Sequence, residues 1–327
     1  MKIAFYSPHL SLRGTEVTMY DFAHYNETIL GNESVVLYNE NNPVNHPTVI
    51  EKFSKRFGDK LYSLKGPDFN FAWQAEYTVP LLDEVIEKEK CDAIYMQKFG
   101  KNDGVISTKC KTLVLVASQI CEPHGDVYAY ISPWLANHMS AGSLPSVSSI
   151  VDLPDIEGDF RELLGIPKEA IVYGRNGGIS TWNIPWASSV VCDVADERDD
   201  IYFLFQNTPQ FTMHPNIKFL PPTADMDFKV KFINTCDAMI HARIEGESFG
   251  LSCAEFSIRN KPIITWNGSP DRNHIEVLGE KGIYYFTPQE LKDVLLSFDK
   301  QPDKDWNAYR CFNPHDAMKT FDEVFLK

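Results

Sequence analysis

The amino-acid sequence predicts an α/β protein made of two Rossmann-like domains. The chain has 327 residues, which is long for one ordinary domain and comfortable for two. Short apolar runs typical of buried strands alternate with helical stretches along most of the chain, and this alternation is typical of βαβ units. Hydrophobic residues make up 43% and charged residues 23% of the sequence, as in an ordinary globular protein.

The first domain is expected at residues 1–150, where strands and helices alternate and predict a mostly parallel sheet. Apolar runs predict its strands at 2–6, 34–38, 92–96, 112–117 and 127–132. Apolar positions at helical spacing predict helices at 16–25, 49–57 and 81–90.

The second domain is expected at 151–305, after a Pro-containing crossing at 151–154. Its predicted strands lie at 171–174, 201–205, 217–220, 237–241, 263–265 and 282–286. Its predicted helices lie at 226–233, from 251 onward and at 289–298, and a loop at 267–274 leads into 275–278. The C-terminal segment 306–327 is predicted to hold a helix at 309–326, or two helices separated near Pro314.

Charge and cysteine usage exclude several classes of partner. The formal net charge of -14 argues against binding to nucleic acid and to an anionic bilayer, and no strong membrane-binding signal is present. No apolar segment approaches the roughly 20 residues that span a bilayer, and the N-terminus runs directly into a strand without a secretory signal. Seven scattered cysteines without a C-x-x-C pair suggest reduced thiols in a cytoplasmic protein and make zinc unlikely.

The segment 240–264 carries the chemistry. Glu247 and Glu255 lie eight residues apart, about two helical turns, and Gly250 lies between them. The backbone of Ser248, Phe249, Gly250 and Leu251 can present N–H groups beside a helix N-terminus, which suits a phosphate or sugar hydroxyls. The two carboxylates could accept hydrogen bonds from a hexose and a ribose. The structural alternative is that Glu247 caps the helix and Glu255 is a solvated helix residue.

This segment resembles the E-x7-E motif of retaining glycosyltransferases of the GT-B fold, chiefly glycosyltransferase family 4. That family reads E-G-F-G-L-x-x-x-E-A and then G-x-P-V-I, where this chain has E-S-F-G-L-S-C-A-E-F from Glu247 and then N-K-P-I-I from Asn260. Residues 160–170 also resemble the family's R-x-x-L-G-I-P at the start of the second domain. The resemblance spans nearly the whole chain but is dense only at 160–178 and 238–285.

The resemblance implies a GT-B architecture of two Rossmann-like domains that face a central cleft. It assigns the acceptor to domain 1–150 and the nucleotide sugar to domain 151–305, and the C-terminal helix at 306–327 would pack back on the first domain. The implied donor is a UDP- or GDP-sugar, and the acceptor is a glycan or another hydroxyl compound. No cofactor and no metal are implied.

Site roles follow from the same resemblance. Glu247 would hold the transferred sugar and Glu255 the ribose, while Gly174 and Arg175 match a Gly-Arg pair that neutralises the departing diphosphate. A Lys that the family places after this pair is missing here. Hydroxyl and amide donors could replace it, another basic residue could reach in, or activity could be weak. Arg175 could alternatively be a surface residue in a turn.

Four further positions are candidates by the same resemblance, and at Gly14 the match is only partial. Gly14 lies where the family usually has a Gly-Gly pair, and the alternative is simple turn chemistry before a helix. His124 lies at the strand-end rim of the first domain, where the family often places a donor-contacting His, and His9 is a weaker candidate. Pro222 follows a strand where GT-B enzymes commonly hold the nucleobase.

Two other interpretations of the sequence stay open. Asp225-Met226-Asp227 resembles the metal-binding D-x-D of other glycosyltransferases, but it begins a predicted helix, where an acid is expected as a cap. The whole chain could also be a non-catalytic sugar-nucleotide binder, or a GT-B-like sugar-nucleotide epimerase, for which no acid/base set is visible in the sequence.

Overall fold

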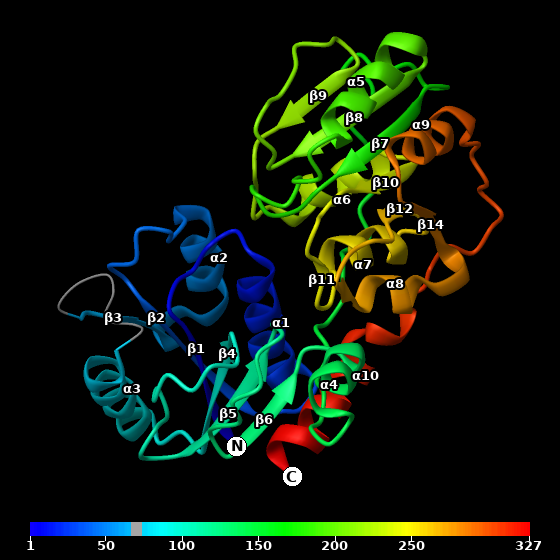
Figure 1. The fold of residues 1–327 in the computed structure, drawn as a ribbon. Coiled ribbons are helices and arrows are strands. Elements are labelled where there is room, and N and C mark those ends of the chain that lie inside the picture. Colours follow the sequence, from blue (N-terminus) through cyan, green and yellow to red (C-terminus); the bar gives the residue numbers. More distant parts are fainter. Residues whose placement is uncertain (67–73) are drawn as a thin grey trace. The chain divides into compact units, whose positions relative to one another are not determined.

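The computed structural model describes residues 1–66 and 74–327. The chain forms two compact units, which we call unit 1 (Met1–Ile150 with Phe312–Lys327) and unit 2 (Val151–Cys311). Each unit is built on a six-stranded sheet (Figure 1). Among the described residues, every helix is too short or too polar to cross a bilayer.

Unit 1 has the strand order β3-β2-β1-β4-β5-β6, and all its strands are parallel. The strands are β1 (Lys2–Ser7), β2 (Glu33–Asn39), β3 (Leu61–Leu64), β4 (Ala93–Lys98), β5 (Lys111–Val116) and β6 (Val127–Tyr130). The helical segments are α1 (Gly14–Thr28), α2 (Pro47–Phe57), η1 (Gly58–Lys60), α3 (Ala75–Glu89), α4 (Pro133–Ser140), α10 (Pro314–Phe321) and η5 (Asp322–Leu326).

Unit 2 repeats the topology with the order β14-β12-β10-β7-β8-β9, again all parallel. Its strands are β7 (Ile171–Arg175), β8 (Ile201–Gln206), β9 (Ile217–Leu220), β10 (Ala238–His241), β12 (Ile263–Trp266) and β14 (Gly282–Tyr285). A small parallel pair joins β11 (Gly246–Glu247) to β13 (Asp271–Arg272). The helical segments are α5 (Ala187–Glu197), α6 (Met226–Thr235), α7 (Leu251–Ile258), α8 (Asn273–Leu278), η3 (Gly279–Lys281), α9 (Pro288–Ser297) and η4 (Arg310–Phe312).

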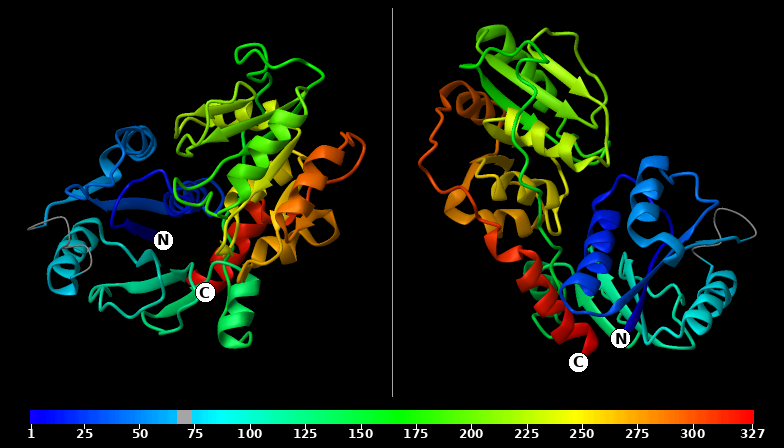
Figure 2. Two further views of the ribbon diagram at one scale, coloured as in Figure 1. Left: turned by 45° about the horizontal axis from the view of Figure 1, so that its top comes forward. Right: turned by 180° about the vertical axis from the view of Figure 1, so that it is seen from behind.

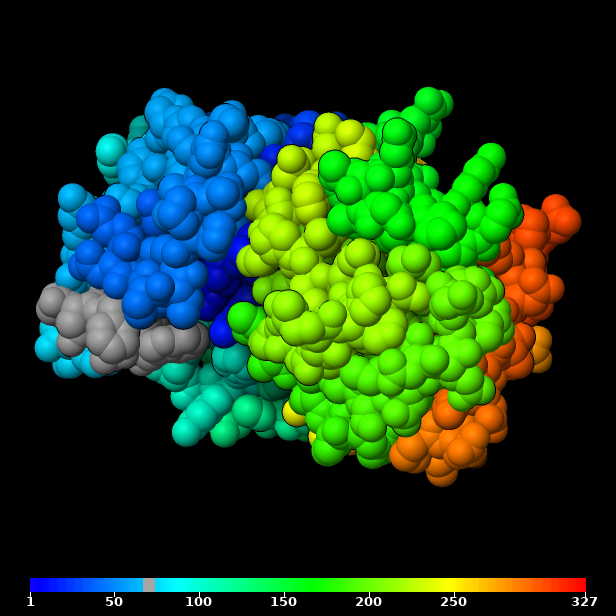
Figure 3. Space-filling model, turned by 90° about the horizontal axis from the view of Figure 1, so that it is seen from above, coloured from blue at the N-terminus to red at the C-terminus, as the bar shows by residue number. Residues whose placement is uncertain are grey.

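The sheet of unit 2 is buried on both faces, as the apolar runs predict. Alternate residues such as Tyr173, Phe203 and Ile264 form one core with α5 and α9. On the opposite face, Gly174 is covered by Cys236, which directly follows α6, and by Phe256 of α7. Figures 1 and 2 show these helix pairs on the two sides of the sheet, and Figure 3 shows residues between β8 and α6 on the face of unit 2 that is seen from above.

The order of strands reverses at one point in each sheet. The reversal lies between β1 and β4 in unit 1 and between β7 and β10 in unit 2. In open α/β sheets the carboxyl ends of the strands at this point form the usual ligand crevice. In unit 2 these ends are Arg175 on β7 and His241 on β10. The loops that follow these two residues are therefore the candidate ligand-binding loops of unit 2.

The structure also differs from the sequence-based prediction. It adds β3, α4 and α5, which were not predicted. The single C-terminal helix predicted at 309–326 is wrong, because the chain forms the short turn η4, begins α10 at Pro314 and ends in the π-helical η5. Proline suits the first helical position, where its missing N–H has no partner anyway. Phe321 of α10 packs on Phe5 and Phe22 in the core of unit 1.

Candidate functional site

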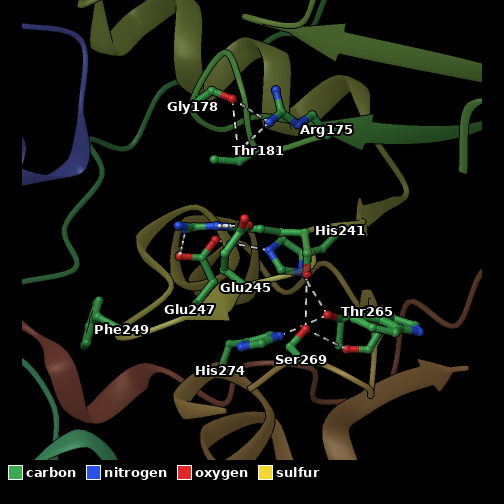
Figure 4. A network of polar contacts seen from close by, with 12 residues as sticks. Arg175, Gly178, Thr181, His241, Glu245, Glu247, Phe249, Thr265, Ser269 and His274 are labelled. Atoms are coloured by element: carbon green, nitrogen blue, oxygen red, sulfur yellow. Dashed lines mark hydrogen bonds and ion pairs between the residues drawn. The ribbon is translucent and has the colours of Figure 1, made fainter. Parts of the chain in front are cut away.

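The loop between β10 and α7 is shaped by Gly246. Its φ of +77° lies in the left-handed region, and an added Cβ would clash with the carbonyl oxygen of Asp271. This close approach lets β11 pair with β13, so that Glu247 lies opposite Arg272 in the ladder. The pairing places Glu247 beside the end of β10 (Figure 4).

Glu247 is the best-held acid of the candidate site. Its Oε1 lies 3.1 Å from His241 Nε2 and its Oε2 accepts a 3.0 Å hydrogen bond from Arg243 Nη1, and 19% of the side chain is exposed. Burial raises the pKa of the Glu247 carboxyl, but the His241 hydrogen bond and the charge of Arg243 outweigh it and lower the pKa to about 2. Glu247 is therefore an ionised hydrogen-bond acceptor and does not cap α7.

Two further polar side chains continue the hydrogen bonding on the side of His241 away from Glu247. His241 Nδ1 lies 2.9 Å from Thr265 Oγ1, which lies 3.1 Å from His274 Nε2. His241 and Thr265 are register partners on β10 and β12, so their side chains emerge side by side from one face of the sheet. Burial, and to a lesser extent the nearby His241, lower the pKa of His274 to about 3, so His274 is neutral at physiological pH.

The start of α7 lies directly after this acid. Gly250 is the N-cap with a φ of +91°, and having no side chain it leaves the first N–H groups of α7, from Leu251 onward, without a side-chain cap. The Phe249 carbonyl accepts hydrogen bonds from Asn273 Nδ2 at 2.8 Å and from the Tyr309 hydroxyl at 3.1 Å. These bonds fix the turn, while Ser248 and Leu251 are half-buried.

Glu255 is not the solvated helix residue of the structural alternative. Its side chain is only 5% exposed, and its Oε1 accepts a 2.6 Å hydrogen bond from Lys229 Nζ on α6. Lys229 is itself largely buried. This ion pair accounts for Lys229, and what takes the place of the missing family Lys stays a prediction.

Arg175 closes β7 and anchors the loop that follows. Its guanidinium is 3% exposed and donates to the carbonyls of Gln206, Asn207 and Gly178 and to the hydroxyls of Thr181 and Thr208. Burial lowers the pKa of Arg175 and outweighs the opposite effect of the Glu247 charge, so the resulting pKa is about 10. The interpretation of Arg175 as a surface turn residue is wrong, and its action on a diphosphate stays a prediction.

The remaining predicted residues have local structural roles. Gly174 has no room for a side chain, because an added Cβ would meet Cys236 Sγ. Pro222 is exposed in the loop after β9, and its contact with a nucleobase stays a prediction. In unit 1, Gly14 is the first residue of α1, and His124 is buried with its Nδ1 2.7 Å from the Glu122 carbonyl and its Nε2 3.3 Å from Lys98 Nζ. The ligand roles predicted for Gly14 and His124 stay predictions.

The D-x-D at 225–227 is a helix cap. Asp225 accepts hydrogen bonds from the backbone N–H groups of Asp227 at 2.9 Å and Phe228 at 3.4 Å, as the capping interpretation predicts. In residues 1–66 and 74–327, no group of three or more His, Cys, Asp or Glu side chains is arranged to hold a metal ion.

Sequence reasoning missed the partners of the two acids. His241, Arg243 and Lys229 contact the acids directly, and Asn183 joins the loop after β7 to Glu245 with hydrogen bonds of 2.9 and 3.3 Å. A signal was available for His241, because it is a polar residue at the carboxyl end of a predicted central strand. Lys229 gave no such signal, since a Lys on an amphipathic helix is usually solvated.

Comparison with known proteins supports the fold. Neither a protein-family model nor a curated protein matches the chain. Among solved structures, Anabaena HepE in complex with UDP-glucose is 13% identical, covers 99% of this chain and 95% of its own, and has a TM-score of 0.66. Sucrose-phosphate synthase from Thermosynechococcus elongatus is 14% identical, with coverages of 99% and 95% and a TM-score of 0.68. UDP-GlcNAc 2-epimerase from Neisseria meningitidis, bound to UDP-GlcNAc, is 13% identical, with 100% of both chains covered and a TM-score of 0.64.

Full-length likeness at this level of identity concerns the fold. Both six-stranded parallel sheets have the doubly wound order with the reversal at their centre. Together with the likeness to HepE and sucrose-phosphate synthase over nearly the whole chain, this confirms the predicted α/β class: the chain has the GT-B fold, with two Rossmann-like units.

Proposed function

We propose that this protein is a retaining glycosyltransferase, similar to family 4 enzymes, that moves a sugar from a nucleoside diphosphate sugar to a hydroxyl acceptor. The observation that carries the proposal is the placement of two acids in unit 2, Glu247 partly buried and Glu255 buried. Glu247 and Glu255 flank a helix N-terminus without a side-chain cap, beside the point where the strand order reverses. The likeness to HepE, which was solved with UDP-glucose, makes a UDP-sugar our first choice of donor.

The two acids differ in what they can recognise. Glu247 is ionised, and each of its oxygens keeps a lone pair beyond the bonds to His241 and Arg243, so it accepts hydrogen bonds from sugar hydroxyls. Glu255 has one oxygen bonded to Lys229, and its carboxylate is assigned to the ribose hydroxyls. The backbone N–H groups at the start of α7 suit the diphosphate between them.

The chemical step needs stabilisation of the leaving diphosphate. The bond between the anomeric carbon and the diphosphate oxygen breaks, the acceptor oxygen bonds to that carbon on the same face, and the acceptor proton passes to the leaving phosphate. Negative charge grows on the diphosphate, where the first N–H groups of α7 would stabilise it, with Arg175 as the nearby cation at the end of β7. The proposed reaction does not require a metal ion.

A donor screen tests this proposal. UDP- and GDP-sugars are added to the full chain, and thermal unfolding identifies the donor, since a ligand at 100 times its dissociation constant stabilises by about 2.7 kcal/mol. The chosen donor is then incubated with and without candidate hydroxyl acceptors. We expect slow donor hydrolysis alone and transfer with an acceptor. Binding with neither hydrolysis nor transfer would overturn the enzyme proposal in favour of a sugar-nucleotide binder.

A sugar-nucleotide epimerase is the second candidate. The Neisseria UDP-GlcNAc 2-epimerase matches both chains over their full length, and the structure brings His241 and His274 together with Glu247, a set of titratable groups that was not evident in the sequence. The screen separates the two candidates, because an epimerase converts its sugar nucleotide to the epimer without an acceptor, and a transferase does not.

A further inference from the structure

A continuous chain of hydrogen bonds leads from Glu247 into the core of unit 2. It runs from Glu247 Oε1 to His241 Nε2 (3.1 Å), from His241 Nδ1 to Thr265 Oγ1 (2.9 Å), and from Thr265 Oγ1 to His274 Nε2 (3.1 Å). Figure 4 shows Thr265 and the two imidazole rings of this chain. Thr265 and His274 are completely buried. Within the described part of the chain, His274 Nδ1 has no hydrogen-bond partner.

The order of donors in this chain follows from counting protons. An ionised carboxylate only accepts, so His241 Nε2 must carry a proton. When His241 carries no second proton, its Nδ1 is an acceptor, and the Thr265 hydroxyl must donate to it. A hydroxyl has one proton, so toward His274 the Thr265 oxygen can only accept, and His274 Nε2 must donate. The lone pair of His274 Nδ1 is then left over.

With this order of donors, the unpaired group is the lone pair of His274 Nδ1, which costs less to bury than an unpaired N–H. The opposite order would make Thr265 donate to His274 Nε2 and would leave an N–H on His274 Nδ1 buried without an acceptor. Buried N–H groups without a partner are rarer in proteins than buried acceptors with spare lone pairs. The direction that Glu247 sets is therefore also the one that leaves His274 with the less costly unpaired group, although His274 lies at the far end of these hydrogen bonds.

We infer that Thr265 and His274 are positioning residues, which bind the free Nδ1 side of His241, hold its ring with Nε2–H toward Glu247 and thereby fix the Glu247 carboxylate for sugar binding. This inference rests on the proposed function only for the identity of the ligand as a sugar. The hydrogen bonds of His241 are a property of the ligand-free protein. Arg243 holds the other oxygen of Glu247, so His241 and Arg243 together leave the carboxylate one orientation. A ligand that offers hydroxyl donors then meets a preorganised acceptor.

The direct test is nitrogen NMR of the ligand-free protein labelled with 15N-histidine, at a pH where His241 is neutral. The ring nitrogens of a neutral imidazole are distinct, so the spectrum shows which of them carries the proton. His241→Gln and His274→Asn identify the two signals among the nine histidines. We expect the Nε2–H tautomer for both rings. An Nδ1–H tautomer on His241 or on His274 would overturn the inference.

Two substitutions of Thr265 test the link to Glu247. In Thr265→Val the Glu247 carboxylate still requires the Nε2–H form of His241, but His241 Nδ1 loses its hydroxyl donor, so the 15N resonance of Nδ1 should shift toward that of a nitrogen without a hydrogen bond, whereas Thr265→Ser should keep the native resonance. Thr235→Val is the matched control, because Thr235 is also fully buried and its hydroxyl bonds to the Phe160 N–H and the Lys231 carbonyl. An unchanged Nδ1 resonance of His241 in Thr265→Val would overturn the inference, and if this variant does not fold, the spectra of the native protein and Thr265→Ser decide.

Binding of UDP-glucose as probe supplies the functional readout. Losing one organised hydrogen bond should raise the dissociation constant about tenfold in Thr265→Val, and Thr265→Ser and Thr235→Val should stay within about twofold of the native protein. A changed Nδ1 resonance of His241 in Thr265→Val without weaker binding would overturn the positioning role. If the native protein does not bind the probe, the proposed donor fails, and the NMR result alone decides the tautomer inference.

Discussion

Glu255 Oε1 lies 2.6 Å from Lys229 Nζ, and this ion pair joins α7 to α6 in the interior of unit 2. The pair explains how an acid can be buried on the sheet side of α7, where an unpaired carboxylate would be strongly unfavourable. The lone pairs that this pair leaves open on the carboxylate provide the acceptor that the proposed ribose contact requires.

The first prediction concerns this pair. Lys229→Met leaves the Glu255 charge buried and unpaired, so the free energy of unfolding should fall by about 3 kcal/mol in urea titrations. Adding Glu255→Gln to Lys229→Met should recover most of that loss. Lys55→Met is the control, because Lys55 pairs with Glu51 on an exposed surface and such pairs contribute at most about 1 kcal/mol. Equal effects of Lys229→Met and Lys55→Met would mean that the interior pair is not formed.

The second prediction concerns the loop that presents Glu247. Gly246→Ala adds a Cβ against the Asp271 carbonyl at a φ of +77°, so β11 and β13 should separate and donor binding should be lost. Gly279→Ala is a matched control, because Gly279 also has a positive φ of +48° but no atom within 4 Å of the added Cβ. We expect Gly279→Ala to cost about 1 kcal/mol from backbone strain alone and to keep donor binding. Donor binding that survives Gly246→Ala would show that the loop geometry is not required.

The third prediction separates two roles of Arg175. Arg175→Lys keeps the positive charge but cannot supply the planar guanidinium that holds the loops after β7 and β8. If anchoring is its main role, amide hydrogen exchange in residues 176–183 should become faster and transfer should decline. Arg310→Lys, at an exposed Arg, controls for the substitution itself. Unchanged exchange and transfer in Arg175→Lys would show that charge alone matters.

The fourth prediction is a pH dependence of stability. His274 has a pKa of about 3 in the folded protein, because burial and then the neighbouring His241 disfavour its charged form, and about 6.5 when unfolded. Below pH 6.5 the unfolded chain gains a proton that the folded protein does not, so the free energy of unfolding falls as the pH drops from 6.5 toward 3.

His274→Asn tests that prediction, since it removes the titrating group. The variant should be less stable at pH 7.5, but its stability should fall less steeply between pH 6.5 and pH 5 than that of the native protein. Denaturant unfolding at several pH values measures both slopes, and parallel slopes would contradict the account of a neutral, buried His274.

Much of the fold could be predicted from the sequence because the buried strands are strongly apolar. The runs at 2–6 and 201–205 are such strands, and the parallel order follows from the alternation with helices. The missed elements carry weaker signals. β3 has four residues at a sheet edge, and α5 begins with Ala-Ser-Ser-Val-Val, which combines weak helix formers and β-branched residues.

The candidate site was only partly predictable for a different reason. The spacing of Glu247 and Glu255 is local and visible, but their partners come from other elements. The contact of Lys229 with Glu255 spans 26 residues, and Thr265 meets His241 through strand register. The two-residue strands β11 and β13 have no periodic pattern at all, so the loop geometry could not be read from hydrophobicity.

Calorimetric binding of the screened donor to Glu247→Gln, Glu255→Gln and Glu276→Gln tests the central claim most directly. Glu276 is exposed on α8 of the same unit and serves as the matched control. If Glu247 and Glu255 hold the sugar and the ribose, each of their substitutions should weaken binding about tenfold or more, because a hydrogen bond to a charged group contributes about 1.5–3 kcal/mol, and Glu276→Gln should bind like the native protein. Native affinity in both Glu247→Gln and Glu255→Gln would contradict the account.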